Sequence, residues 1–481
     1  MTVSAPTKLW DKGYELDPRI EKFEIGDDTV YDNRLILPDV LGSIAHAAGL
    51  AKVGLLDGDV FWKLHGGLAQ IADLAEDGEF SIEPGDEDVH TKIENWLTQQ
   101  LGEAGKRIHT GRSRNDQVLV DLRLYTREAV LPVYGAVLEA CDALLQMATE
   151  YRMLPMPGYT HMQRAMLSSV GVWAGAYLEA LLDDLDLLDA AVKLNDQNPL
   201  GSAASYGVAL PLDRQYVSDL LGFGKVQNNV LYAQNARGKF EVAIVQALTQ
   251  VALGFSKLAQ DIMLFTTSEY NFFSIDDSLL TGSSIMPQKR NLGAVELLRA
   301  KGQVMLSYQQ QMLGVLIGLP AGYNMDFQET KRPFMEALDL IENSAAVVAL
   351  TVSRLVPNEN KMAEACSPEL FATDAAYDLV LQGVPFRDAY KQVALSLDTL
   401  ENIDPEAHLV KHTHQGTSGD LRLGVSSDKI AHRKEVLAKR AAELDAIKTG
   451  LLTGSAAGLP LPSPGPTNGS LPQPAGDASD R

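Results

Sequence analysis

The chain has 481 residues, of which 46% are hydrophobic, and its 41 basic and 63 acidic residues give a formal net charge of −22. This length allows a large buried core and two or three structural units. Because so negative a protein repels phosphate backbones and anionic lipids at long range, the charge argues against nucleic acid and membrane surfaces as partners.

The beginning of the chain and its cysteines indicate a compartment. The start, MTVSAPTKLWDKG, has neither the basic region nor the apolar region of a secretory signal, and no run of about 18 uncharged apolar residues follows. Two cysteines, Cys141 and Cys366, are too few for a disulfide framework. We therefore expect a cytoplasmic protein.

The apolar pattern divides the chain into a small N-terminal unit and a long helical middle. Residues 1–117 combine short helical patterns with glycine-rich joins and acidic stretches, which predicts a mostly helical domain. Residues 118–358 carry long segments with helical spacing, such as 167–188, where apolar residues recur at every third or fourth position. Segment 240–265 is apolar over a wider arc, which indicates burial either against other subunits or within a large core.

The C-terminal part reads as a further helical domain followed by a tail. Helical spacing predicts a domain at residues 359–450. Residues 451–481 are rich in proline and have little to bury, so we expect a disordered tail there.

Polar, glycine-punctuated stretches precede the long helices of the middle at 108–118, 156–166 and 280–291. The first contains Arg112 and Arg114 and follows Lys106 and Arg107, which predicts a local anion site. The third places Lys289 beside a Gly-Ser-Ser turn whose N–H groups could also face an anion. Taken singly, such stretches are usually structural ion pairs or helix caps, but together they indicate a pocket for carboxylates.

These stretches carry a resemblance to a known family. GSSIMPQKRN, from Gly282 to Asn291, resembles the signature of the fumarase and aspartase superfamily, and HTGRSRNDQV resembles the argininosuccinate lyase form of the first loop. EDVHTKIE, GYTHMQRA and YNMDFQETK are similar to the same family. The likeness runs from about Leu9 to about residue 450. It departs at Leu292 and Gly293, where the family has Pro-Asp, and at Gly26, where many members have serine.

The resemblance implies a mainly α, three-domain fold with a long central helical bundle. It also implies a homotetramer, in which the central helices of four subunits form one multi-helix core. Each active site would then take its three signature loops from three different chains.

The implied activity is the reversible β-elimination of argininosuccinate to L-arginine and fumarate, a step of arginine biosynthesis that needs no cofactor. Such a reaction requires one base and one acid, and its carbanion-like intermediate requires cations and N–H donors near a carboxylate. The resemblance makes Ser283 the base, assisted by Lys289, and makes Lys289 and Asn291 the stabilisers of the intermediate. It pairs His161 with Glu296 for protonation of the leaving guanidine, either directly or by positioning the acid.

The resemblance also assigns side chains that hold the substrate. These are Asp88, Ser113, Arg114, Asn115, Thr160, Asn291, Tyr323, Gln328 and Lys331.

Other functions remain open at this stage. Adenylosuccinate lyase also releases fumarate, although the sequence SRNDQ resembles the argininosuccinate lyase form of this loop. Delta-crystallin, a lens structural protein, has the same fold and offers a non-catalytic alternative. The four predicted catalytic residues, His161, Ser283, Lys289 and Glu296, are all present, which favours an active enzyme. The departures from the family pattern at Leu292 and Gly293 leave the non-catalytic alternative open.

A histidine cluster offers a possible metal site. His408, His412 and His414 lie close together in the sequence, but no nearby acidic or cysteine ligand supports them. We therefore predict no metal site and assign these residues to a solvated helix end.

Overall fold

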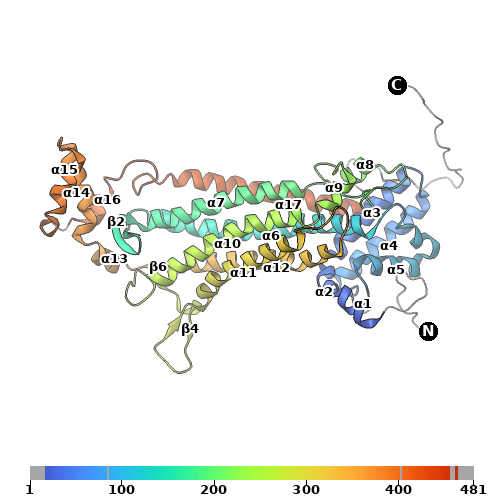
Figure 1. Cartoon of the computed structure of the whole chain (residues 1–481), viewed down its shortest axis with the longest axis horizontal. Coiled ribbons are helices and arrows are strands. Elements are labelled where there is room, and N and C mark those ends of the chain that lie inside the picture. The colour runs from blue at the N-terminus through green and yellow to red at the C-terminus, as the bar shows by residue number, and fades with distance from the viewer. Residues whose placement is uncertain (1–16, 84–85, 401–402, 456–460, 464–481) are drawn as a thin grey trace, which may run out of the picture.

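The computed structural model describes residues 17–83, 86–400, 403–455 and 461–463. It is an elongated, mainly helical molecule in which long helices pack side by side along its length (Figure 1). These helices are α6 (Arg114–Glu150), α7 (Val170–Asn195), α10 (Lys239–Phe265), α11 (Gly293–Leu316) and α12 (Lys331–Ser353). The predicted mainly α fold with a long central helical bundle is confirmed.

The apolar spacing of α7 explains how this helix enters the bundle. Leu178, Leu181, Leu185 and Leu188 are each at most 2% exposed, and they point into one core shared with α6 and α10. The helix begins at Ser169, whose hydroxyl caps it by accepting a hydrogen bond from the N–H of Val172. The predicted stripe is therefore the buried face of α7 from Val170 on, whereas Leu167, which was predicted to belong to the same helix, lies in β2 (Gln163–Ser169).

Shorter helices form the N-terminal end of the molecule, at the right of Figure 1. They are α1 (Pro18–Ile25), α2 (Asp28–Tyr31), η1 (Asp32–Leu35), α3 (Ile36–Lys52), α4 (Gly58–Glu76), α5 (Val89–Leu101) and η2 (Gly102–Arg107). Helix α3 is almost entirely buried, which explains its nearly continuous apolar sequence. Helices α8 (Arg214–Leu220) and α9 (Val230–Asn235) lie in the connection between α7 and α10.

Short antiparallel pairs interrupt the helices. They are β1 (Pro155–Thr160) with β2 (Gln163–Ser169), β3 (Phe273–Ile275) with β6 (Leu355–Pro357), and β4 (Thr281–Gly282) with β5 (Arg290–Asn291). The first pair lies at the end of the bundle opposite α1–α5, and the β4–β5 hairpin projects from its side (Figure 1). Short 3₁₀ segments join other elements at η3 (Asp277–Leu279) and η4 (Met325–Thr330).

The C-terminal part is spread along the whole molecule. Six short elements of this part lie at the end of the bundle that carries the β1–β2 hairpin (Figure 1). They are α13 (Glu359–Ala365), η5 (Pro368–Phe371), α14 (Ala372–Leu381), α15 (Phe386–Ala394), η6 (Leu397–Thr399) and α16 (Pro405–Leu409). Helix α17 (Leu423–Thr453) then returns along the bundle and contacts α3, α4, α6 and α7. The domain division at 118, 359 and 451 remains an interpretation, because α17 packs with the two preceding domains.

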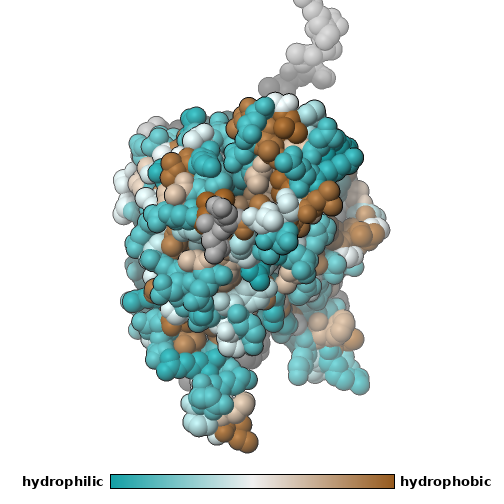
Figure 2. Space-filling model, turned by 90° about the vertical axis from the view of Figure 1, so that its left-hand side faces the viewer, coloured by the Kyte–Doolittle hydropathy of each residue, from teal (hydrophilic) through white to brown (hydrophobic). Residues whose placement is uncertain are grey.

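The end of the molecule that carries α13–α16 has a mainly hydrophilic surface with several separate apolar patches (Figure 2). Leu381 and Leu395 are 85% and 88% exposed there. No single apolar face dominates this view, so this end of the molecule does not have the large continuous apolar surface of an obligate subunit interface.

The boundary expected at residue 451 needs a correction. Helix α17 continues to Thr453, because Leu451 is fully buried in the main core. Beyond it, the indole N–H of Trp62 donates to the carbonyl of Pro462 at 2.9 Å, and Leu461 packs against the core. The other residues of the predicted tail, 456–460 and 464–481, lie outside the described part of the chain.

Three helical segments have the length and hydropathy of membrane-crossing helices: Asp28–Lys52, Arg114–Glu150 and Val230–Phe265. In the structure, 83%, 50% and 61% of their most apolar windows are buried within the protein. The apolar character of the first segment, Asp28–Lys52, is explained by its burial in the core of this chain. The other two keep a partly uncovered apolar surface on the long helices.

Candidate active site

A pocket of about 210 Å³ lies where the N-terminal helices meet the start of α6. Six of the residues predicted to hold substrate line it: Asp88, Arg114, Asn115, Tyr323, Gln328 and Lys331. Sites that enclose a small molecule usually measure about 300–1,000 Å³. The volume therefore suits part of a substrate.

The N-terminus of α6 positions Arg114 and Asn115. The Ser113 hydroxyl accepts from the N–H of Asn115, and the Asp116 carboxylate accepts from the N–H of Ser113, which together form a capping box. The second oxygen of Asp116 accepts from the N–H groups of Gly201 and Ala203 at 3.0 and 2.8 Å. Ser113 thus serves the helix cap and does not line the pocket, so its contact with substrate remains a prediction.

Arg114 is held by two acids on the pocket wall. One guanidinium nitrogen lies 2.8 Å from both Glu87 and Asp88. Asp88 also caps α5 by accepting from the N–H of Thr91 at 2.7 Å. Burial alone would raise the pKa of Asp88, but nearby His90 and Arg114, with the Thr91 hydrogen bond, hold it below its usual range.

Lys331 is buried between two carboxylates. Its ammonium lies 2.9 Å from Asp28 and 2.5 Å from Asp32. Burial would lower the pKa of Lys331, and these carboxylates instead raise it. For Asp28, burial is the largest influence and raises the pKa to about 6, although Lys331 acts in the opposite direction.

The anion site predicted for the first loop needs a correction, because basic side chains of this loop already have partners within the chain. The Lys106 ammonium pairs with Glu103 at 2.5 Å, His109 lies 3.4 Å from Glu94, and buried Arg112 donates to the hydroxyl of Ser43. Glu103 lies three positions before Lys106 in η2, whereas Glu94 and Ser43 come from α5 and α3, which the sequence of the loop does not reveal. Among the described residues of the pocket wall, the carboxylates outnumber the lysine and arginines. The acids are Glu21, Glu24, Asp28, Asp32, Glu87 and Asp88, and the bases are Arg114, Arg237 and Lys331.

A buried network that reaches the pocket wall through His90 was missed by the sequence analysis. The His90 Nδ1 lies 2.5 Å from Asp39 and 3.4 Å from Asp121, and the Gln117 amide donates to Asp39 at 2.7 Å. Burial, followed by repulsion from Asp39, raises the pKa of Asp121 well above its usual value. The available signal was the presence of Asp39 within an otherwise apolar helix.

The predicted catalytic histidine lies at the opposite end of the bundle. His161 and Met162 form the two-residue turn between β1 and β2, since Thr160 pairs with Gln163 across it. Their φ angles are 53° and 60°, in the left-handed region that most non-glycine residues disfavour, although Asn, Asp and His enter it more often than the others. Two of the described non-glycine residues with positive φ therefore lie at the turn that contains the predicted catalytic histidine.

Ser283, Lys289 and Asn291 lie on the exposed β4–β5 hairpin. The Ser283 hydroxyl accepts from the N–H groups of Ile285 and Met286 at 3.3 and 3.1 Å, so both loop amides favour negative charge on that oxygen. The Asn291 amide donates to the carbonyl of Gly282 at 3.4 Å. Glu296 follows in the first turn of α11.

One copy of the chain does not bring all these groups together. Helix α6 has 37 residues and so separates its ends by about 55 Å, with Arg114 at one end and the β1–β2 hairpin just beyond the other. Helix α11 has 24 residues and places the β4–β5 hairpin about 36 Å from the pocket end. Within the described residues, no contact joins His161 to Glu296. The residues predicted to act together therefore lie at distant places in one chain.

Solved structures share this architecture. The crystal structure of EDDS lyase in complex with formate superposes with a TM-score of 0.77 and 22% identity, covering 90% of this chain and 95% of that one. A class II fumarase from Schistosoma mansoni gives a TM-score of 0.68 and 17% identity, covering 82% and 95%. At these identities the likeness establishes the fold.

Sequence comparison is more specific. Residues 15–306 match a protein family described as Lyase. An argininosuccinate lyase from Parabacteroides distasonis is 42% identical over 414 residues, covering 86% of this chain and 92% of the relative. The argininosuccinate lyase from Thermotoga neapolitana is 40% identical over 387 residues, covering 80% and 97%. With this identity over nearly the whole length of both relatives, the chain belongs to the argininosuccinate lyase family of the fumarase/aspartase superfamily.

Proposed function

We propose that this protein cleaves argininosuccinate to L-arginine and fumarate, as a cytoplasmic step of arginine biosynthesis. The observation that carries the proposal is the pocket in which six residues expected to hold substrate converge from distant parts of the sequence. The excess of carboxylates on its wall suits the cationic groups of the arginine portion. The succinate portion then extends out of the pocket.

The remaining groups come from other copies in a homotetramer. Thr160, His161 and the Ser283 hairpin are exposed, and they lie tens of ångströms from the pocket of their own chain. Leu187 and Leu194 of α7 and Leu253 of α10 are 51%, 47% and 41% exposed, which supports burial of the long helices against further subunits. Each site would draw on three chains.

In a site assembled this way, Ser283 removes a proton from the carbon next to a succinate carboxylate. The two loop amides and Lys289 favour its alkoxide form. The electron pair of the broken C–H bond moves onto the carboxylate, where Lys289 and Asn291 face the resulting negative charge.

Collapse of this intermediate forms the fumarate double bond and breaks the carbon–nitrogen bond. The guanidino nitrogen takes up the bonding electrons and a proton, which His161 supplies or positions while Glu296 orients its ring. One proton is removed at carbon and one is delivered at nitrogen, so no cofactor is needed to balance the step.

The test follows fumarate release by its ultraviolet absorbance with purified protein and either argininosuccinate or adenylosuccinate. We expect turnover of argininosuccinate only, and a fall of several orders of magnitude in kcat for Ser283→Ala. Ser284→Ala, at the neighbouring serine, is the matched control and should stay close to the parent protein. Turnover of adenylosuccinate alone, or of neither substrate, contradicts the proposed activity, whereas near-normal turnover by Ser283→Ala removes that residue from the role of base.

A further inference from the structure

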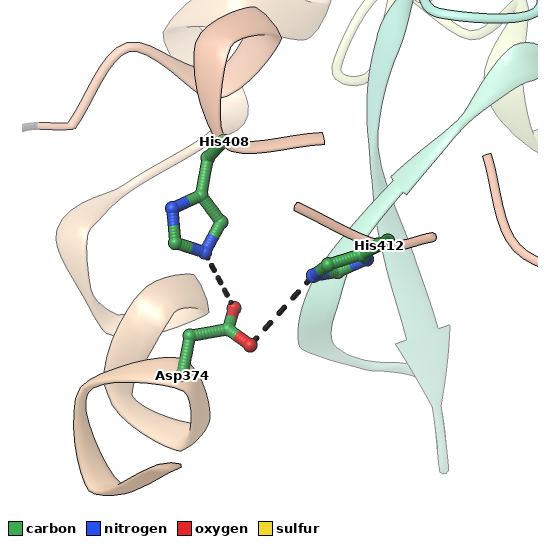
Figure 3. Close-up of side chains that lie close together, drawn as sticks. All are labelled: Asp374, His408 and His412. Carbon is green, nitrogen blue, oxygen red and sulfur yellow. Dashed lines mark ion pairs between the residues drawn. The ribbon is translucent and has the colours of Figure 1, made fainter. Parts of the chain in front are cut away.

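The histidine cluster of the C-terminal part is not a solvated helix end. His408 is only 3% exposed, and Asp374, from the first turn of α14, reaches both His408 and His412 (Figure 3). The sequence analysis found no acidic partner because Asp374 lies more than thirty positions earlier in the chain. His414, by contrast, is exposed and contacts the carbonyl of Gln415.

The donor atoms have the spacing of a metal site. Nε2 of His408 lies 3.0 Å from Oδ2 of Asp374, and Nε2 of His412 lies 3.7 Å from Oδ1. One donor atom from each residue lies within 4.8 Å of the others. Two ligands bound at about 2.1 Å to one tetrahedral Zn²⁺ lie about 3.4 Å apart, which falls between the two observed distances.

The surroundings separate this cluster from an ordinary surface ion pair. Oδ2 of Asp374 is buried, and apart from its ion-pair contact with His408 it makes no hydrogen bond within the described part of the chain, so an acceptor is left incompletely satisfied. The Phe371 ring packs edge-on against His408 with centroids 5.1 Å apart. The side chains of Asp374 and His412 are 18% and 22% exposed, which leaves a path from solvent.

We propose that Asp374, His408 and His412 bind one divalent cation of the zinc class. Two imidazole nitrogens and one carboxylate oxygen suit Zn²⁺ better than Ca²⁺ or Mg²⁺, which prefer ligand sets made of oxygen alone. Water fills the fourth position on the solvent side. The site lies far from the substrate pocket of its own chain and takes no part in the elimination.

The cation would brace the hairpin that carries His161. Leu167 of β2 packs with Phe371 and Leu409, which are the neighbours of His408 on η5 and α16. A bound ion would join α14 to α16 on the far side of this small core. The strained turn at His161 would then rest on a more rigid support.

The experiment measures Zn²⁺ binding to the full chain, freed of metal with a chelator, by equilibrium dialysis. We expect one Zn²⁺ per chain, and binding weakened more than about tenfold in His412→Ala and in Asp374→Asn, since even the loss of an outer-shell partner has an effect of that size. His414→Ala is the matched control and should bind as the parent does. Bound Co²⁺ should give visible absorption bands that the two ligand variants lack.

Circular dichroism should show that each variant is folded, and because the His412 side chain is partly exposed, its substitution disturbs the core less than substitution of buried His408. Absence of Zn²⁺ binding by the parent protein overturns the proposal. Equal affinity of the parent and His412→Ala does so as well, because the ion would then be bound at another place.

Discussion

At the scale of single residues, the β1–β2 turn combines a functional position with a backbone cost. Two consecutive non-glycine residues with positive φ are each disfavoured by about 1–2 kcal/mol. Two-residue turns of this kind usually contain Asn-Gly or Gly-Gly, because these residues adopt positive φ with little strain. Neither His161 nor Met162 is a residue that relaxes such a turn best, which is consistent with the role proposed for His161.

Met162→Gly tests the strain without touching the histidine. Glycine adopts positive φ freely, so we expect the free energy of unfolding to increase by about 1 kcal/mol in urea titrations. Met166→Gly, in β2 of the same hairpin, is the control and should decrease it, because glycine weakens a strand. A decrease for both variants would show that the turn is not strained.

Asp28 makes stability depend on pH. Burial raises its pKa to about 6 in the folded chain, above the ordinary value of 3.8, so the folded chain binds this proton more tightly than the unfolded chain. The resulting stabilisation is fully present below about pH 4 and is lost as the pH rises through 6. Relative to Asp28→Asn, the protein should lose roughly 1 kcal/mol between pH 5 and pH 7.5 in denaturant titrations. A gap between the two proteins that is the same at both pH values would contradict this assignment.

At the scale of elements, Asp116 ties the start of α6 to a distant loop. Its carboxylate accepts from three backbone N–H groups, those of Ser113, Gly201 and Ala203, and it is fully buried. Asp116→Ala should lower the free energy of unfolding by about 3 kcal/mol or more, because buried donors lose their acceptor. It should also lower kcat/KM, since Arg114 and Asn115 follow directly.

Ser113→Ala is the comparison for this prediction. It removes only the hydroxyl of the capping box and should cost about 1 kcal/mol in the same titration. If both substitutions had the same effect, Asp116 would act as a cap alone and not as the link to the loop.

The long helices were predictable because their apolar residues repeat at every third or fourth position, as in α7. The hairpins were not, since β1 and β2 bury residues irregularly and give no alternating pattern. The family resemblance supplied six residues of the pocket, including Asp88, which pairs with Arg114, but it did not supply the acidic partners of Lys331. Asp28 and Asp32 meet Lys331 across about 300 positions, and no local pattern encodes such a pairing.

At the scale of the whole molecule, the residues predicted to hold substrate and those predicted to transfer protons lie at different places along the bundle. This arrangement predicts that inactive variants can restore each other. Mixed oligomers of Ser283→Ala and Arg114→Gln should regain fumarate release, because some sites would combine an intact hairpin from one variant with an intact pocket from the other. Co-expression followed by assay of the purified mixture measures this.

The matched control for complementation combines Ser283→Ala with Lys289→Met. Both changes lie in one hairpin, so no mixed oligomer contains an intact copy of it. Recovery by this pair, or no recovery by the first pair, would contradict sites shared between chains.

Because α6 is one continuous helix, its length fixes the position of the β1–β2 hairpin relative to Arg114. The number of residues in the middle of the helix therefore matters, although these residues lie far from the substrate pocket. Deleting one residue in its interior would turn the β1–β2 hairpin by about 100° and draw it in by about 1.5 Å relative to Arg114. If the two ends serve different pockets, that single shift would misalign every pocket of the oligomer at once. Insertions and deletions in this helix should therefore be as harmful as the loss of a catalytic side chain, although point substitutions on its solvent face are tolerated.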